Sequence, residues 1–136
     1  MPELLKFYQS KPNHKHLKKA VKVLQDGGLV IYPTDTVYAL GCLSNSIKGL
    51  QRLASIKEVR LENANFSFFI RDFSDLSNYI KPLEKSTFKL IKRCLPGPYT
   101  LILPCLKLQK PFDKRKSIGI RMANHPILRE LMGLLK

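Results

Sequence analysis

Hydrophobic positions recur along the chain with a helical period in some segments and in short continuous runs in others. Residues 13–26 place their apolar side chains on one helical face and lysines largely on the other, which predicts an amphipathic helix. Asn13 suits the helix start, and Gly27 and Gly28 suit its end. The same spacing predicts helices over residues 46–56 and 83–95, a short helix over 72–79 and a last helix from Pro126. Ile47 and Leu134 are expected to be buried.

Short apolar runs between these helices predict strands. They lie at residues 29–32, 39–43, 65–70, 99–103 and 117–122. Residues 57–65 are predicted to be irregular, and residues 104–116 form a basic connection. Because helices and strands alternate without repeats, we expect a single α/β domain with a twisted open mixed sheet and flanking helices.

The composition is that of an ordinary globular domain. The chain has 136 residues, 44% of them hydrophobic, and its apolar runs are too short to span a bilayer. Residues 1–12 have no signal-peptide pattern and are predicted to be an N-terminal extension of a domain at 13–136. The three cysteines show no metal-ligand spacing, which predicts no protein-bound metal and a reducing, cytoplasmic setting.

Net charge is the strongest compositional feature. Twenty-four Lys and Arg against ten Asp and Glu give a formal charge of +14, which favours a polyanionic partner such as RNA or nucleotide phosphates. The basic residues are spread over 15–22, 85–93 and 107–116, as on a folded basic surface and unlike a disordered arm. A basic surface exposed only to solvent is the alternative.

A strand followed by a polar loop is the first candidate site. The segment GGLVIYPTDTVYALGC, residues 27–42, passes from an apolar strand through Pro33 into Thr34, Asp35 and Thr36. Ligand sites of α/β proteins often lie in such loops beyond strand ends. An ordinary hydroxyl or Asx turn explains the same residues.

Further candidates are basic or hydroxyl-bearing. Lys57 and Arg60 suit a phosphate clamp, although a solvated helix end is the alternative. Thr34, Thr36 and Thr100 offer hydroxyls that suit either a ligand or the local turns. Arg121 lies in an apolar strand and needs a carboxylate partner, either Asp35 or a carboxylate of the substrate. No nucleophile with an activating base is evident, so no catalytic side chain is predicted.

Four segments in order resemble one known family. They are PTDTVYALG at residues 33–41, the pair Lys57 and Arg60, PGPYT at 96–100 and SIGIRM at 117–122. Together they resemble the YrdC-like domain, which threonylcarbamoyl-AMP synthases share with YciO-type proteins. The matches run across nearly the whole chain.

The resemblance implies a reaction and its ligands. Such a protein forms L-threonylcarbamoyladenylate from ATP, L-threonine and bicarbonate, releases pyrophosphate, and supplies N6-threonylcarbamoylation of tRNA. Mg²⁺ would accompany the phosphates of ATP. The resemblance also implies nucleotide binding by Lys57, Arg60 and Thr100, and threonine binding by Thr34, Thr36 and Arg121. The alternative is a non-catalytic YciO-type domain that binds double-stranded RNA or tRNA.

This chain departs from the family pattern at several positions. Ala39 replaces a glycine, Glu58 stands between Lys57 and Arg60, Phe69 stands where synthases often carry histidine, and Ala123 stands where proline is common. These departures resemble the YciO-type branch. The family domain continues for roughly another 60 to 70 residues, including a Ser-x-N segment. The resemblance therefore predicts a domain that is incomplete at its C-terminal end.

Overall fold

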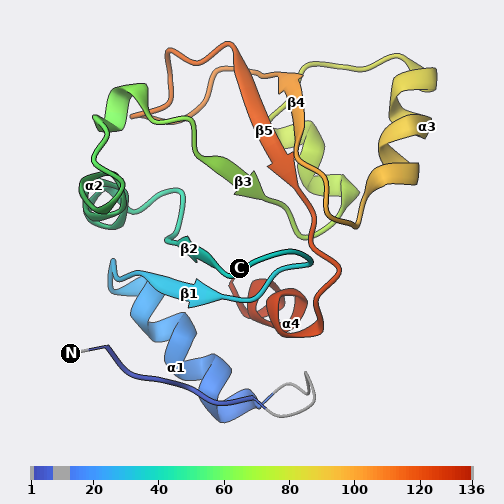
Figure 1. Ribbon diagram of the computed structural model, residues 1–136. Helices are drawn as coiled ribbons and strands as arrows, with labels where there is room; N and C mark the ends of the chain where they lie inside the picture. Colours follow the sequence, from blue (N-terminus) through green and yellow to red (C-terminus); the bar gives the residue numbers. More distant parts are fainter. Residues whose placement is uncertain (1, 8–12, 136) are drawn as a thin grey trace.

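The computed structural model describes residues 2–7 and 13–135. In chain order, the helices and strands of this part are α1 His14–Gln25, β1 Val30–Tyr32, β2 Ala39–Gly41, α2 Ile47–Ile56, the 3-10 helix η1 Leu61–Asn63, β3 Ser67–Phe69, the 3-10 helix η2 Phe73–Asn78, α3 Lys85–Cys94, β4 Leu101–Pro104, β5 Ser117–Arg121 and α4 Pro126–Leu134 (Figure 1). Every predicted helix and strand is present, with ends shifted by a few residues. None of the described helices is both long enough and apolar enough to cross a membrane.

Side chains at the helix ends explain where α1 and α2 begin and stop. The Asn13 side chain accepts a hydrogen bond from the His16 amide, and Ser46 caps α2 by accepting from the Gly49 amide at 3.1 Å. These caps satisfy amides that have no partner inside the helix. Gly27 follows α1 with a φ of 83°, a conformation that glycine adopts at little cost.

The strands form two sheets, which confirms the mixed α/β class and divides the predicted sheet into two. β1 and β2 make an antiparallel pair in which Ile31 faces Leu40. β5 lies between the other two strands, parallel to β3 and antiparallel to β4. Figure 1 shows β3 and β2 as neighbouring strands of the two different sheets.

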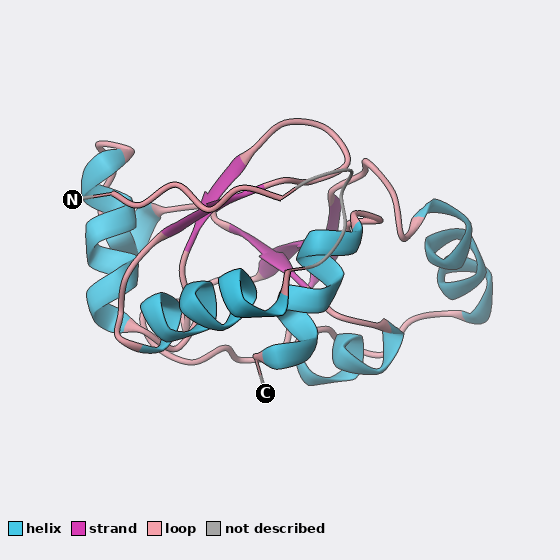
Figure 2. Ribbon diagram, turned by 90° about the horizontal axis from the view of Figure 1, so that it is seen from below, coloured by secondary structure: helices cyan, strands magenta, loops and turns pink. Residues whose placement is uncertain are grey.

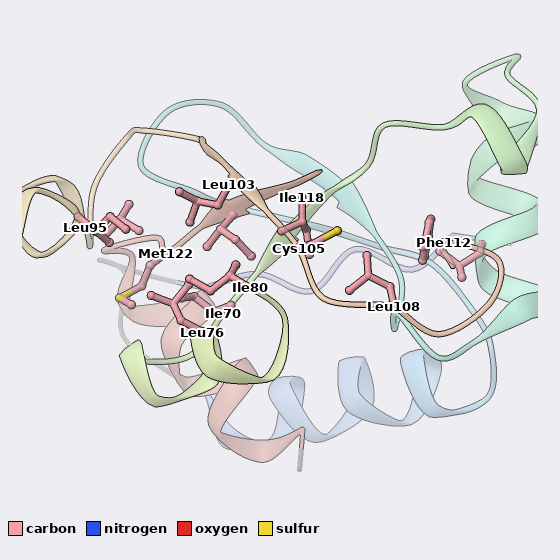
Figure 3. Packing of buried hydrophobic residues seen from close by; sticks show 13 residues of the cluster. Ile70, Leu76, Ile80, Leu95, Leu103, Cys105, Leu108, Phe112, Ile118 and Met122 are labelled. Carbon is pink, nitrogen blue, oxygen red and sulfur yellow. The ribbon is translucent and has the colours of Figure 1, made fainter. Parts of the chain in front are cut away.

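One face of the three-stranded sheet carries the larger hydrophobic cluster. Ile118 and Ile120 on β5 are 0% exposed, and β4 and α3 contribute Leu103 and Ile91. Figure 3 labels Leu103 and Ile118 of this cluster together with Leu76 of η2, and it shows Leu108 and Phe112 of the basic connection at one end. The segment predicted as a basic connection therefore also supplies part of the core.

The second hydrophobic cluster joins α1 to α4. Leu17 and Leu24 of α1 pack with Ile127 and Leu131 of α4. Both helices lie below the β1–β2 pair in the view of Figure 1, and Figure 2 looks at the molecule from that side. Val30 and Tyr32 of β1 and Phe69 of β3 pack against the same cluster. The two sheets are thus held together partly through this helical layer.

Two residues expected in the core are exposed. Ile47 is 47% exposed and Leu134 is 37% exposed. They are the first residue of α2 and the last residue of α4, so each stands at a helix end. The helical period shows which face of a helix is apolar, but it does not show how far along the helix other elements cover that face.

The described part of the N-terminal extension packs on α1. The Lys6 carbonyl oxygen lies 3.0 Å from His16 Nδ1, and the Phe7 ring meets the His16 ring edge-on. Glu3 pairs with Lys19 at 3.1 Å, but both side chains are largely exposed and contribute little. Residues 8–12 of the predicted extension lie outside the described residues.

We expect Ile120→Ala to lower the free energy of unfolding by about 2–5 kcal/mol, because the cavity left in this cluster cannot refill. Ile102→Ala on the neighbouring strand β4 is the matched control, since Ile102 is 74% exposed. Its effect should stay under about 0.5 kcal/mol. Urea unfolding of both variants measures the difference, and equal losses would contradict this account of the core.

Candidate functional site

A cleft of about 1050 Å³ lies between the two sheets. Residues 38–44 and 63–69 line it as two unbroken runs, one containing β2 and the other β3. Because neighbouring strand residues point to opposite faces, unbroken runs mean that the edges of both strands border the cleft. Lys57 lies on the wall after α2, and Arg71, Arg121, Leu128 and Leu131 are among the other lining residues.

A cation and two aromatic rings form one side of this cleft. Phe69 and Arg121 stand directly opposite each other in the parallel β3–β5 pair. The Arg121 guanidinium lies over the Phe69 ring, with its central carbon 5.0 Å from the ring centre. The Tyr32 ring meets the Phe69 ring edge-on, with the two ring centres 5.7 Å apart. The pairing of β3 with β5, together with the contact between Tyr32 and Phe69, therefore connects β1 to β5.

Arg121 has no acidic partner among the described residues. None of their carboxylates lies within 4.0 Å of it, and its Nε is buried without a hydrogen-bond partner. Asp35, the expected structural partner, instead accepts a hydrogen bond from the Asn124 amide at 2.8 Å. Since a buried donor without a partner is costly, the arrangement suits an anionic ligand.

Tyr32 is held neutral beside this cation. Burial raises the pKa of Tyr32 to about 12, and the nearby positive charge of Arg121 opposes that rise only in part. Gly41 makes room for the ring, because a Cβ there would come within 2.9 Å of the Tyr32 ring and hydroxyl. The last glycine of the PTDTVYALG segment thus has a packing role.

The Lys57–Arg60 segment begins with a strained turn. α2 ends in a Schellman motif, in which the Val59 amide donates to the Ala54 carbonyl and the Glu58 amide donates to the Ser55 carbonyl. Glu58 has a φ of 56°, where glycine is the usual residue. Lys57 lines the cleft, whereas Arg60 is exposed and does not line it.

The three candidate threonines do not line the cleft. Thr34 is buried, and its hydroxyl donates to the Val37 carbonyl at 2.6 Å and accepts from the Thr36 amide at 3.2 Å. Thr36 and Thr100 are exposed. Leu101 of β4 pairs with Ile120 of β5 in antiparallel register. Thr100, the residue before Leu101, therefore lies at the height of Arg121, the residue after Ile120. The cleft itself therefore brings together only Lys57 and Arg121 of the six predicted ligand-binding residues.

Two residues of the site were not predicted from the sequence. Tyr32 and Phe69 each lie in a short apolar run, where aromatic residues are usual in buried strands. The resemblance contained one signal, because it marked Phe69 as a departure from the histidine of synthases. Nothing in the pattern marked Tyr32.

The cleft has few groups for a metal ion. Among residues 2–7 and 13–135 there is no group of three or more His, Cys, Asp and Glu side chains. Asp75 is a carboxylate of the lining and already accepts a hydrogen bond from the Arg71 amide. These residues do not fit a Mg²⁺ ion held by protein side chains alone.

Comparison with known proteins identifies the class. The Sua5/YciO/YrdC family, described as "Telomere recombination", matches residues 22–136. YciO of Escherichia coli, described as uncharacterised, is 33% identical over 99% of this chain. Its crystal structure superposes with a TM-score of 0.80, covering 92% of this chain. The chain therefore belongs to the Sua5/YciO/YrdC family.

More distant relatives carry a functional name. Threonylcarbamoyl-AMP synthase of Chromobacterium violaceum is 29% identical over 84% of this chain and is covered over 60% of its own length. Sua5 of P. abyssi, solved with L-threonine, has a TM-score of 0.81 and 27% identity, with 92% of this chain and 37% of that chain covered. This chain spans 66% of the YciO sequence and 61% of the YciO structure.

Replacing Glu58 by glycine tests the strain in the Lys57–Arg60 segment. We expect Glu58→Gly to raise the free energy of unfolding by about 1 kcal/mol, because glycine adopts positive φ without a Cβ clash. Glu62→Gly, four residues further on, is the control. Glu62 is not among the positive-φ residues, so its replacement should bring no gain. Thermal or urea unfolding measures both, and an equal response would show that Glu58 is not strained.

Proposed function

We propose that the cleft carries out the chemistry of a threonylcarbamoyl-AMP synthase, joining ATP, bicarbonate and L-threonine. The observation that carries this proposal is that Lys57 and Arg121 line the same cleft, and that Arg121 has no carboxylate partner among the described residues. With Arg71, the lining holds three cations, which suit anionic groups such as a phosphate chain and a carboxylate. The synthase relatives and the threonine-bound Sua5 structure support the same reaction.

Each ligand has residues suited to hold it. Lys57 would bind phosphate oxygens of ATP, and Arg60 and Thr100 would contact the nucleotide from the rim. Arg121 would bind the threonine carboxylate, and Thr34 and Thr36 lie in the loop beyond β1, outside the lining of the cleft. Mg²⁺ would enter as part of the ATP complex.

The reaction needs positioning more than a reactive side chain. Bicarbonate and the threonine amine form a carbamate and release water, and a carbamate oxygen then attacks the α-phosphorus. The bond from that phosphorus to the β-phosphate oxygen breaks, and pyrophosphate leaves. Cations that hold both reactants in line lower the barrier by orientation and by stabilising developing charge. The product would serve N6-threonylcarbamoylation of tRNA.

Pyrophosphate release tests this proposal. We expect release from the full chain only when ATP, L-threonine and bicarbonate are all present. Lys57→Ala and Arg121→Met should each lower the rate at least about tenfold, since each removes a charge-assisted contact. Lys22→Ala, on the exposed side of α1, is the control for charge and should keep the rate. No release, or release independent of threonine, would contradict the proposal.

A second candidate function is binding of double-stranded RNA or tRNA, and α3 is the observation that favours it. Lys85, Lys89, Lys92 and Arg93 are exposed and fall within about 100° of the helix circumference. The ten residues of α3 include no acidic side chain. Like charges four residues apart destabilise a helix, and a polyanion would relieve that repulsion.

The position of α3 favours nucleic acid over a membrane surface. α3 lies at one end of the molecule, away from α1 (Figures 1 and 2). Its apolar side packs into the core through Ile91 and Phe88, so that side is not available to enter a lipid layer. The lysines of α1 form a separate basic surface.

Salt dependence tests RNA binding by α3. We expect affinity for an RNA duplex to fall steeply with salt, as each phosphate contact releases counterions. Lys85→Gln combined with Lys89→Gln should weaken binding and lower the log–log salt slope by about 2. Lys15→Gln combined with Lys18→Gln on α1 is the control with equal charge loss. A salt-independent affinity, or equal weakening by both pairs, would contradict a site on α3.

A further inference from the structure

We propose that Phe69 makes the Arg121 site insensitive to a side-chain hydroxyl. The site would then take small β-branched amino acids as a class, L-valine as well as L-threonine. The proposal rests on the proposed function in one respect, that the ligand of Arg121 is an amino-acid carboxylate. It adds which amino acids the site distinguishes.

The first step is the orientation of the guanidinium. Phe69 covers one face of it at 5.0 Å, and the strand pairing keeps the two residues opposite each other. A guanidinium covered on its face still offers its N–H groups along its edges. A carboxylate binding in that plane would supply the partner that the buried Nε lacks.

The second step is what surrounds a carboxylate held there. The carboxylate and the Cβ of an amino acid are both attached to Cα, so the Cβ substituents would lie close to the guanidinium. Phe69 borders that space, and Tyr32 packs edge-on against Phe69. A phenyl ring neither donates nor accepts a conventional hydrogen bond, whereas a histidine at this position could do both. Phe69 therefore offers contact to a methyl group and no recognition of a hydroxyl.

The third step is the placement of the other hydroxyls. The Thr34 hydroxyl is engaged within its own loop, and Thr36 and Thr100 do not line the cleft. Ser67 faces the same side of β3 as Phe69, but two residues away, which is about 7 Å along a strand. Ser67 and Tyr32 both carry a hydroxyl and line the cleft, and Tyr32 packs against Phe69. Both residues therefore belong in the test.

Threonine and valine form a suitable pair of probes because they have nearly the same shape. A site that hydrogen-bonds a hydroxyl rejects an analogue without it by about 10⁴-fold or more, whereas an apolar pocket discriminates such isosteres by about 10²-fold at most. The ratio of the two dissociation constants therefore reports directly whether the site reads the hydroxyl.

The test is an NMR titration of the full chain with L-threonine and with L-valine. For the wild type we expect dissociation constants within about threefold of each other, because Phe69 itself offers only apolar contact. Phe69→His should favour threonine by about tenfold, whereas Phe69→Leu should keep the wild-type ratio. Ser67→Ala and Tyr32→Phe should each leave the ratio unchanged. Dispersed amide spectra check that each variant folds.

Arg121→Met separates the outcomes. If Arg121→Met weakens the binding of both amino acids at least about tenfold, Arg121 binds the amino-acid carboxylate. A wild-type preference for threonine of tenfold or more would then overturn only the role of Phe69. The same ratio of the two dissociation constants in Phe69→His and Phe69→Leu would do so as well. Binding that Arg121→Met does not weaken, or no binding of either amino acid, would overturn the proposed ligand of Arg121 and this inference with it.

Discussion

The parallel pairing of β3 with β5 places Phe69 directly opposite Arg121, and the arrangement of the cleft follows from that pairing. The ring covers one face of the guanidinium, Tyr32 packs against the ring, and Tyr32 links the first sheet to the second. A shift of one residue in this register would turn Arg121 into the hydrophobic cluster that holds Ile118 and Ile120. An unpartnered charge there would be far more costly than the lost contacts.

Two features, one in the cleft and one beside it, do not contribute to the stability of the fold. Arg121 has a buried Nε without a partner, and Glu58 adopts a conformation that glycine would adopt at lower cost. Both lie at segments that the family resemblance connects with ligands. Such local costs persist where the rest of the structure determines the backbone, and the α1–α4 layer and the β5-centred core supply that support.

Much of the fold could be predicted from local patterns, and less of the site. Helical spacing predicted α1 and α2, and Asn13 and Ser46 cap them. The motif order predicted the family that the comparisons confirm. Local patterns did not predict that Thr34 would be engaged within its own loop, or that Asp35 would hold the Asn124 amide. Residue type shows what a side chain can bond, but its partner depends on segments distant in the chain.

The amino-acid sequence by itself determined the helices and strands, the basic charge and the four ordered motifs, because each depends on residues close together in the chain. Tertiary structure alone decided that the strands divide into two sheets and that Lys57 and Arg121 share the cleft between them. It also decided that Phe69, one of several apolar residues in its strand, covers the guanidinium. Strand pairing between residues 67–69 and 119–121 sets that contact, and a local pattern holds no information about which distant strand becomes the partner.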